Sequence, residues 1–382
     1  MLPYRPLAFL ALALILPGAA VASEWYVYFG TRSADPGAGI SLAHFDSETG
    51  ALSQPVQVYA TPAPVFFALS PNARRLYVCH GGDTFNGQPG SAVSAFDIDG
   101  TNGHLTLLNQ QSTIGNGGSH VSLDRSGRVL LAANYRAGSV VTFSLESDGR
   151  IGVHRSLAQH TGRSVHPQRQ SAPHPHAIYA DPTNNFALVP DLGTDRISIY
   201  HLDAATGTLE PNAPPALAMP PGSGPRHLAW HPNGQHVYVV NELANSVTVL
   251  TWDATRGVLL AGETVPTLAA DFAGENTAAE IAVHPNGRFL YVSNRGTESS
   301  LTVFALDPSG EHATVVERVP SRGKWPRNFV IDPTGRWMIV SNHDSDNAVV
   351  FRIEPATGRL SPVGEPVSLR IPFGIALVPA QP

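Results

Sequence analysis

Charged and imidazole side chains occupy corresponding ends of a hairpin that recurs along this chain. In the copy GPRHLAWHPNGQHVYVVNE, residues 224–242, Arg226 stands near the start of the first strand and Glu242 ends the second, around an Asn233-Gly234 turn. Equivalent ends of other copies carry His176, Glu280, Arg295 and Arg327. Arginines bind carboxylates, phosphates and oxyanions through paired N–H donors, whereas carboxylates and imidazoles transfer protons. Because partly buried charges are costly unless they are paired or used, these residues predict a catalytic or binding site.

Six copies of this hairpin define the organisation of the chain. They are FALSPNARRLYVCH from residue 67, VSLDRSGRVLLAANY from 121, AIYADPTNNFALVPDL from 177, LAWHPNGQHVYVVNE from 228, IAVHPNGRFLYVSNR from 281 and FVIDPTGRWMIVSNH from 329. Most are followed by a third strand, such as NSVTVLTWD, and by a fourth after a glycine-containing turn. Four-stranded units of roughly 50 residues are typical of propeller blades.

The two ends of the chain complete a seventh unit. Near the N-terminus, WYVYFGT, GISLAHFD and ALSQPVQVYA match the second, third and fourth strands, and IPFGIALVP near the C-terminus matches a first strand. We expect residues 373–378 to pair with 25–30, which closes the ring and removes an open sheet edge. The predicted fold is all-β: a seven-bladed β-propeller with four antiparallel strands per blade.

This architecture explains why the charged residues converge. The first strand of a blade is innermost and the second pairs antiparallel with it, so the start of one and the end of the other meet at one mouth of the channel. Other recurring residues have a structural interpretation: Asn134, Asn241, Asn294 and Asn342 bond backbone where strands end, and His231 and His284 cap turns at the opposite end. Asn241, next to Glu242, is also counted among the candidate substrate contacts. Taken alone, Arg226 and Glu242 are equally consistent with a simple ion pair.

Composition and charge exclude several classes of protein. The 382 residues are 42% hydrophobic, enough for a large core, and the formal net charge of −6 offers no basic surface for nucleic acid. Cys79 is the only cysteine, so no intrachain disulfide is possible. There is no Ser-His-Asp elbow or HExxH signature, and arginine outnumbers carboxylate at the predicted mouth, which disfavours a hard cation. We therefore expect no metal and no cofactor.

The N-terminus is typical of an export signal. Residues 1–5 are weakly positive, residues 6–17 are apolar, and Ala20-Val21-Ala22 forms a small-x-small cleavage site. The apolar run is too short to span a membrane, and no later stretch is suitable. We predict a cleaved signal peptide over residues 1–22 and a single propeller domain over 23–382. The protein is expected to be a periplasmic or secreted monomer.

Several motifs resemble the β-propeller lactonase family over essentially the whole mature chain. They are ENTAAEIAVHPNGRFLYVSNRG, WPRNFVIDPTGRWMIVSNHDSDNAVVFRI, GPRHLAWHPNGQHVYVVNE and RQSAPHPHAIYADPTNNFALVPDLGTDRI. This family includes bacterial 6-phosphogluconolactonases and fungal 3-carboxy-cis,cis-muconate lactonizing enzymes. The resemblance implies an active site of His176 in PHPH, Arg226 in GPRH, Glu242 in VVNE and Arg295 in SNRG. It also matches Arg169-Gln170 and Arg327, and it implies that the His-rich stretch 159–176 covers the cleft instead of binding metal.

The reaction implied by the resemblance is hydrolysis of a lactone. By residue type, Glu242 suits a general base for water, Arg226 and Arg295 suit anion or oxyanion binding, and His176 suits a proton donor to the leaving alkoxide. The candidate substrate-binding residues are Arg327, Glu280, His174, Arg169 and Asn241. An export signal does not suit a cytoplasmic sugar-phosphate pathway, so an unphosphorylated aldonolactone is at least as suitable a substrate. Two alternatives stay open: a cycloisomerase that closes a carboxymuconate, and a non-catalytic exported binding module.

Overall fold

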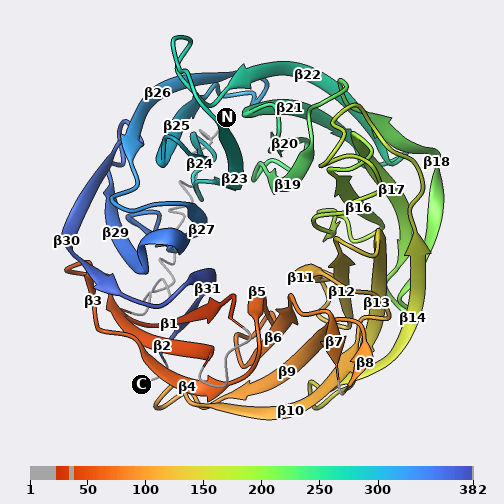
Figure 1. Cartoon of the computed structure of the whole chain (residues 1–382), viewed down its shortest axis with the longest axis horizontal. Coiled ribbons are helices and arrows are strands. Elements are labelled where there is room, and N and C mark those ends of the chain that lie inside the picture. Colours follow the sequence, from red (N-terminus) through yellow and green to blue (C-terminus); the bar gives the residue numbers. More distant parts are fainter. Residues whose placement is uncertain (1–22, 34–37, 86, 381–382) are drawn as a thin grey trace, which may run out of the picture.

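The computed structural model describes residues 23–33, 38–85 and 87–380, so the predicted signal peptide, residues 1–22, lies outside the described residues. Within these ranges, seven antiparallel sheets are arranged in a ring around a central axis (Figure 1). The one helical element described is a 3₁₀ turn, His343–Ser345. No helix in the described ranges has the length and apolarity needed to cross a bilayer. The predicted seven-bladed propeller is confirmed.

Blades 2 to 7 each have four strands, which follow one another from the axis outwards. Blade 2 has β5 (Pro64–Leu69), β6 (Arg75–His80), β9 (Ala92–Ile98) and β10 (Leu105–Ser112). Blade 3 has β11 (Gly118–Leu123), β12 (Val129–Asn134), β13 (Ser139–Leu145) and β14 (Ile151–Gln159). Blade 4 has β15 (Tyr179–Ala180), β16 (Phe186–Asp191), β17 (Arg196–Asp203) and β18 (Thr208–Ala218). Blade 5 has β19 (Pro225–Trp230), β20 (His236–Asn241), β21 (Ser246–Asp253) and β22 (Val258–Pro266). Blade 6 has β23 (Asn276–Val283), β24 (Phe289–Gly296), β25 (Ser300–Leu306) and β26 (Ala313–Pro320). Blade 7 has β27 (Pro326–Ile331), β28 (Trp337–Asn342), β29 (Asn347–Ile353) and β30 (Leu360–Ser368). A small hairpin, β7 (Thr84–Phe85) and β8 (Gln88–Pro89), is inserted in blade 2 between β6 and β9.

Blade 1 joins the two ends of the chain. Its innermost strand is β31 (Pro372–Pro379), followed by β1 (Glu24–Thr31) and β2 (Gly39–Asp46), and Figure 1 shows β31 beside β1. Trp25 lies opposite Pro379 and Phe29 opposite Ile375, which confirms the predicted closure. The outer strand is not continuous as expected but consists of β3 (Ala51–Leu52) and β4 (Val56–Ala60), which both pair with β2. The interruption contains Pro55, which has no N–H to give to the ladder.

Apolar faces and tyrosine hydroxyls hold neighbouring blades together. Every residue of the second strand β20 is buried, and its apolar side chains pack in clusters shared with the adjoining sheets. In four blades a tyrosine of the second strand donates to a glycine carbonyl in the outer turn of the next blade: Tyr28 to Gly103 at 2.6 Å, Tyr77 to Gly149 at 3.0 Å, Tyr238 to Gly310 at 2.9 Å and Tyr291 to Gly358 at 2.9 Å. Each of these bonds satisfies a buried hydroxyl and fixes one blade on its neighbour.

The recurring polar residues have the structural contacts that the sequence predicts. Nδ2 of Asn241 donates to Ser246 Oγ at 3.0 Å and to Thr248 Oγ1 at 2.9 Å, so it ties the end of β20 to β21. His231 Nδ1 accepts the Asn233 N–H at 3.1 Å, and its Nε2 donates to the Gly287 carbonyl oxygen of the next blade at 2.9 Å. His284 repeats both contacts one blade further on. These histidines are therefore turn caps that also join blades.

A β-bulge near the start of the innermost strands determines which side chains reach the mouth of the channel. In β19, Pro225 pairs with Asn241 and His227 with Val240, so Arg226 is the extra residue. The same shift makes extra residues of Val65 in β5, Ser119 in β11 and Arg327 in β27. A bulge breaks the strict alternation of a strand and re-aims a side chain. The hairpin pattern of the sequence gives no sign of it.

Candidate active site

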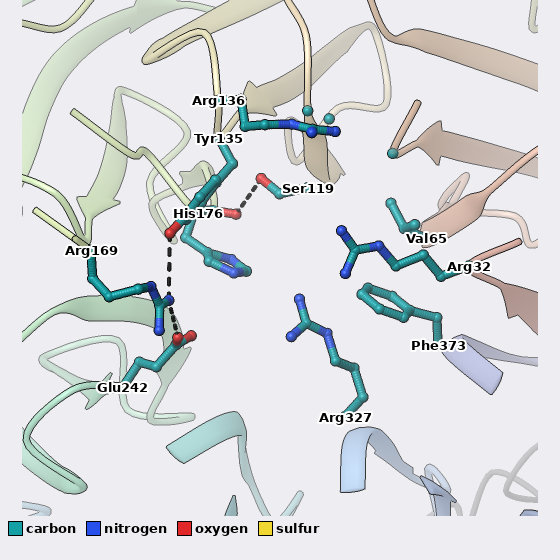
Figure 2. A pocket seen from close by; sticks show the side chains of 13 residues that line it. Arg32, Val65, Ser119, Tyr135, Arg136, Arg169, His176, Glu242, Arg327 and Phe373 are labelled. Atoms are coloured by element: carbon teal, nitrogen blue, oxygen red, sulfur yellow. Dashed lines mark hydrogen bonds and ion pairs between the residues drawn. The ribbon is translucent and has the colours of Figure 1, made fainter. Parts of the chain in front are cut away.

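A pocket of about 240 Å³ lies at the mouth of the channel where the innermost strands begin. Its lining includes four arginines, one carboxylate, one imidazole and two aromatic rings: Arg32, Arg136, Arg169, Arg327, Glu242, His176, Tyr135 and Phe373. Figure 2 shows the side chains of Arg32, Arg327 and His176 directed from different sides toward the same central space. The pocket is thus strongly cationic, which suits a negatively charged ligand or a developing oxyanion.

Glu242 is surrounded by arginines. Oε1 accepts from Arg169 Nη2 at 2.5 Å, and Oε2 lies 3.1 Å from Arg226 Nε and 3.1 Å from Arg295 Nη2. Arg226 and Arg295 are almost fully buried and are fixed in place by donating to the backbone carbonyls of Ala279 and Ala278. One carboxylate therefore organises three guanidinium groups at the wall of the pocket.

The pKa of Glu242 follows from this arrangement. Burial by itself raises the pKa, but the charges of Arg295, Arg169 and Arg226 outweigh it and lower the pKa to about 2. The carboxylate is consequently ionised at neutral pH, and both of its oxygens already face guanidinium groups. A carboxylate with so low a pKa and so many partners is a weak proton acceptor.

His176 differs from Glu242 both in its charge and in its hydrogen-bond partners. It lies just before β15, in a segment where Pro175 makes only an isolated bridge with Asp191, and Ser119 Oγ donates to its carbonyl oxygen at 2.9 Å. Burial lowers the pKa of His176 well below its usual value, and the charges of Arg226, His227 and Arg327 add to that effect. The imidazole is therefore neutral at pH 7. Its Nδ1 is buried without a hydrogen-bond partner, which leaves Nε2 as the nitrogen available to the pocket.

Arg327 and Arg32 flank the ring of Phe373. Their guanidinium carbons lie 4.2 Å and 5.7 Å from the ring centroid, and Nε of Arg327 is buried without a hydrogen-bond partner. In the described part of the chain, neither forms an ion pair with a carboxylate. Cations held against an aromatic face, with free N–H donors toward a pocket, are suited to an anionic group of a ligand.

Arg169 reaches the pocket from the His-rich stretch 159–176. The adjacent Gln170 is fully buried, donates to the Leu192 carbonyl oxygen at 2.9 Å and accepts the His166 N–H at 3.0 Å, so this stretch is firmly anchored. Tyr135 lines the pocket next to Arg169, and its hydroxyl accepts a hydrogen bond from Arg169 at 3.5 Å.

Six of the nine predicted site residues meet at this mouth, and four of them line the pocket: Glu242, Arg169, His176 and Arg327. Arg226 and Arg295 are buried behind its wall, in contact with Glu242. His174 stacks on the Tyr135 ring with centroids 4.4 Å apart, so it supports the wall from behind. The amide of Asn241 is directed into its own blade, toward Ser246 and Thr248. Glu280 lines a different pocket further along the channel.

Sequence reasoning missed four lining residues as functional candidates: Tyr135, Phe373, Arg32 and Arg136. Tyr135 and Phe373 stand at the predicted strand ends, but their aromatic character did not separate them from core residues. Arg32 follows the N-terminal strand, which is the second strand of its blade, so it is the counterpart of Glu242. Aligning the N-terminal strand with the second strands of the other blades would have placed Arg32 at the position of Glu242. Arg136 pairs with Asp83 at 2.6 Å, a contact that joins the rim to the inserted hairpin and has no sequence signal.

Among the residues that the structure describes, no three acidic, histidine or cysteine side chains converge as ligands for a metal ion. Cys79 is buried, and burial raises the pKa of its thiol to about 12, which suits a small core residue. The polar side chains that line the pocket belong to arginine, histidine, glutamate, serine and tyrosine residues.

Comparison with known proteins gives consistent matches along the chain. Residues 26–376 match the family described as Lactonase, 7-bladed beta-propeller. The 6-phosphogluconolactonase of Bacillus subtilis (strain 168) is 36% identical over 350 residues, which cover 92% of this chain and 97% of that protein. The 6-phosphogluconolactonase of Pectobacterium carotovorum is 35% identical over 312 residues, 82% of this chain and 86% of that protein. The solved structure of the periplasmic gluconolactonase of Pseudomonas aeruginosa has a TM-score of 0.88 at 29% identity and covers 94% of this chain and 100% of that one.

Proposed function

Because the chain belongs to the lactonase family of seven-bladed β-propellers, as its motifs predict, we propose that it hydrolyses a sugar lactone of the aldonolactone type. The observation that carries this proposal is a pocket in which several guanidinium groups surround one neutral imidazole. Hydrolysis of a neutral lactone forms first an oxyanion and then a carboxylate. Both are stabilised by arginines that are already in place before the reaction.

In the proposed mechanism, His176 moves the protons. Its neutral imidazole accepts a proton from the attacking water and returns one to the alkoxide that leaves when the ring opens. Arg327, Arg32 and Arg169 face the pocket and stabilise the negative charge on the former carbonyl oxygen. Glu242 is assigned a positioning role, since its low pKa and three arginine partners favour it less than His176 as the general base.

The preferred substrate is an unphosphorylated aldonolactone, met in the periplasm or outside the cell. Support comes from the predicted export signal and from the similarity to a periplasmic gluconolactonase. If the signal is used, protein made with its native leader in a Gram-negative host is recovered from the periplasm or medium without its first 22 residues or thereabouts. Intact Met1 on cytosolic protein, found by mass spectrometry, would restore the phosphorylated lactone as the favoured substrate. We propose a monomer as the working state.

The decisive test is a panel of substrates assayed by proton release. The mature protein is incubated with glucono-δ-lactone, with its 6-phosphate and with a carboxymuconate. The spontaneous rate of each reaction is measured without protein and subtracted. Faster turnover of the unphosphorylated lactone supports the proposal. Preference for the phosphorylated lactone would show that the proposed substrate is wrong. Closure of the muconate would show that the protein is a cycloisomerase. Binding of a lactone without turnover would make the protein a non-catalytic module.

A further inference from the structure

The segment that brings Arg169 and His176 to the pocket is a long loop between β14 and β15. No residue between Gln159 and Tyr179 belongs to a strand, so the ladder of the sheet does not hold this loop in place. Side chains that act in a site must be held to within a fraction of an ångström by contacts around them. For this loop, those contacts converge on Asp191, the last residue of β16.

Asp191 is fully buried, and both of its carboxylate oxygens accept hydrogen bonds. Oδ2 accepts from Nδ1 of His160, at the start of the loop, at 2.6 Å. Oδ1 accepts the N–H of His174, near the end of the loop, at 2.7 Å, and those of Gly193 and Thr194 at 3.0 Å and 3.2 Å. A carboxylate forms stronger hydrogen bonds with N–H groups than a neutral acceptor does. One side chain thus fastens both ends of the loop to the end of β16.

Asp191 departs from the repeat to which it belongs. Four other blades end their second strand with an asparagine: Asn134, Asn241, Asn294 and Asn342. In each of them Nδ2 is the atom in use, and it donates to a nearby hydroxyl, carbonyl or amide oxygen. Their Oδ1 atoms are buried and have no hydrogen-bond partner in the described part of the chain. Blade 4 therefore replaces a donor that ties strands together with an acceptor that holds the loop.

The turn after Asp191 also packs directly on the end of the loop. A Cβ at Gly193 would lie 1.9 Å from the Ala172 carbonyl oxygen and 2.8 Å from the His174 nitrogen. Only glycine allows the two backbones to come this close. Two residues further on, the His176 N–H donates to the Pro190 carbonyl oxygen at 2.9 Å. The backbone that leads into His176 is consequently fixed against the end of β16.

The position of His174 is transmitted to the pocket through Tyr135. His174 Nδ1–H donates to the Tyr135 carbonyl oxygen at 2.8 Å, and the two rings stack with their centroids 4.4 Å apart. The Tyr135 ring in turn lies edge-on to the imidazole of His176, at 5.4 Å and 76°. Its hydroxyl accepts the hydrogen bond from Arg169 (Figure 2). A displacement of His174 would therefore move the surface against which both site residues rest.

We propose that Asp191 is a positioning residue: by fastening both ends of the loop, it holds His176 and Arg169 where they act on the lactone. This inference rests on the proposed function, through the role given there to His176. Asp191 lies outside the pocket lining and acts only through the loop. Misplacement of a reacting group by about 1 Å can lower a rate on the order of 100-fold, so such a role is measurable.

Removal of the Asp191 carboxylate is tested against a matched loss in the same blade. Asp181, also fully buried, accepts the N–H groups of Asn185 and Phe186, both at 2.9 Å, in the turn at the other end of β16. Asp191→Ala and Asp181→Ala should therefore lower the melting temperature by similar amounts. Only Asp191→Ala should also lower kcat, by about 10–100-fold, because it alone releases the loop. Wild-type kcat in Asp191→Ala, or an equal loss of kcat in Asp181→Ala, would overturn the proposal.

Two further variants separate the position of the loop from the charge of Asp191. An asparagine can accept the same N–H groups and donate to His160, whose ring then takes its other tautomer, so Asp191→Asn should recover most of the kcat lost in Asp191→Ala. Gly193→Ala keeps the carboxylate but pushes on the backbone at Ala172, so it should lower kcat as Asp191→Ala does. Wild-type kcat in Gly193→Ala would contradict the proposal. If Asp191→Ala does not fold, Gly193→Ala replaces it.

The NMR signals of the His176 ring give a readout that does not depend on turnover. Because this ring lies against Tyr135, its ¹H and ¹³C shifts report the relative position of the two rings. The signal, identified by its loss in His176→Asn, should move in Asp191→Ala and stay in Asp181→Ala. A signal that stays in Asp191→Ala contradicts the positioning role even in an active lactonase. A signal that moves in a protein without lactonase activity supports that Asp191 places His176 and overturns the proposed function alone.

Discussion

Glu242 is the residue on which the arginine wall depends. Glu242→Gln leaves Arg226 and Arg295 buried without their counter-charge, so the free energy of unfolding should fall by about 3–5 kcal/mol. Glu365→Gln, at a side chain that is 90% exposed, should change it by no more than about 0.5 kcal/mol. Denaturant titration measures both. Equal stability of Glu242→Gln and the wild type would show that the arginines do not need this carboxylate.

The same carboxylate should give stability a defined acid dependence. Its pKa is lowered from 4.5 to about 2 in the folded protein, so the unfolded chain binds the proton more readily. Its contribution is complete above about pH 4.5 and is lost as the pH falls toward 2. The difference in melting temperature between wild type and Glu242→Gln should therefore be constant above that range and narrow below it.

His176 should set the acid side of the activity profile. Because burial and the nearby arginines lower its pKa well below 6.5, kcat/KM should stay level through pH 6.5 and fall only at more acidic pH, as the imidazole is protonated. His176→Asn should lower kcat by about 10²–10⁴-fold. An acid limb centred near pH 6.5 would contradict the assignment of this histidine as the base.

At the scale of elements, Asn241 tests whether a strand-end amide serves stability or catalysis. Asn241→Ala removes the donor to Ser246 and Thr248 and should lower the free energy of unfolding by about 1–3 kcal/mol. Since its amide does not line the pocket, kcat should be nearly unchanged. Thermal unfolding and lactone turnover, measured on one preparation, separate the two effects. A large loss of kcat with normal stability would return Asn241 to the substrate-binding group.

The sequence predicts elements well where their signal is periodic and poorly where it depends on local register. Repeated hairpins were enough to predict seven blades and the pairing of the two ends, because each blade buries the same alternating residues. The bulge at Arg226 and Arg327 adds one residue to a ladder, and the pattern of apolar residues is the same with or without it. Glu280 was misplaced for this reason. A comparable shift in β23, between Ala278 and Ile281, directs it away from the first pocket and toward His227.

At the scale of the whole molecule, stability depends on the strand contributed by the C-terminus. Deletion of residues 372–382 removes β31, including the buried Phe373, Ile375 and Val378, and leaves one edge of β1 unpaired. We expect the shortened chain to lose cooperative thermal unfolding and to aggregate in size-exclusion chromatography. Deletion of residues 381–382 alone is the control and should behave as the full chain. A monomeric, cooperatively folded protein without β31 would contradict the closure argument.

The join between β1 and β31 also decides when the molecule can be complete. Strand β31 leaves the ribosome after six whole blades have been made, while its partner β1 is among the first segments to emerge. Until then every nascent chain has an open ring, and the native state is out of reach. If the predicted signal peptide directs this chain through a membrane pore, the order of synthesis is an advantage, because the polypeptide cannot reach its final form before its last strand has been translated.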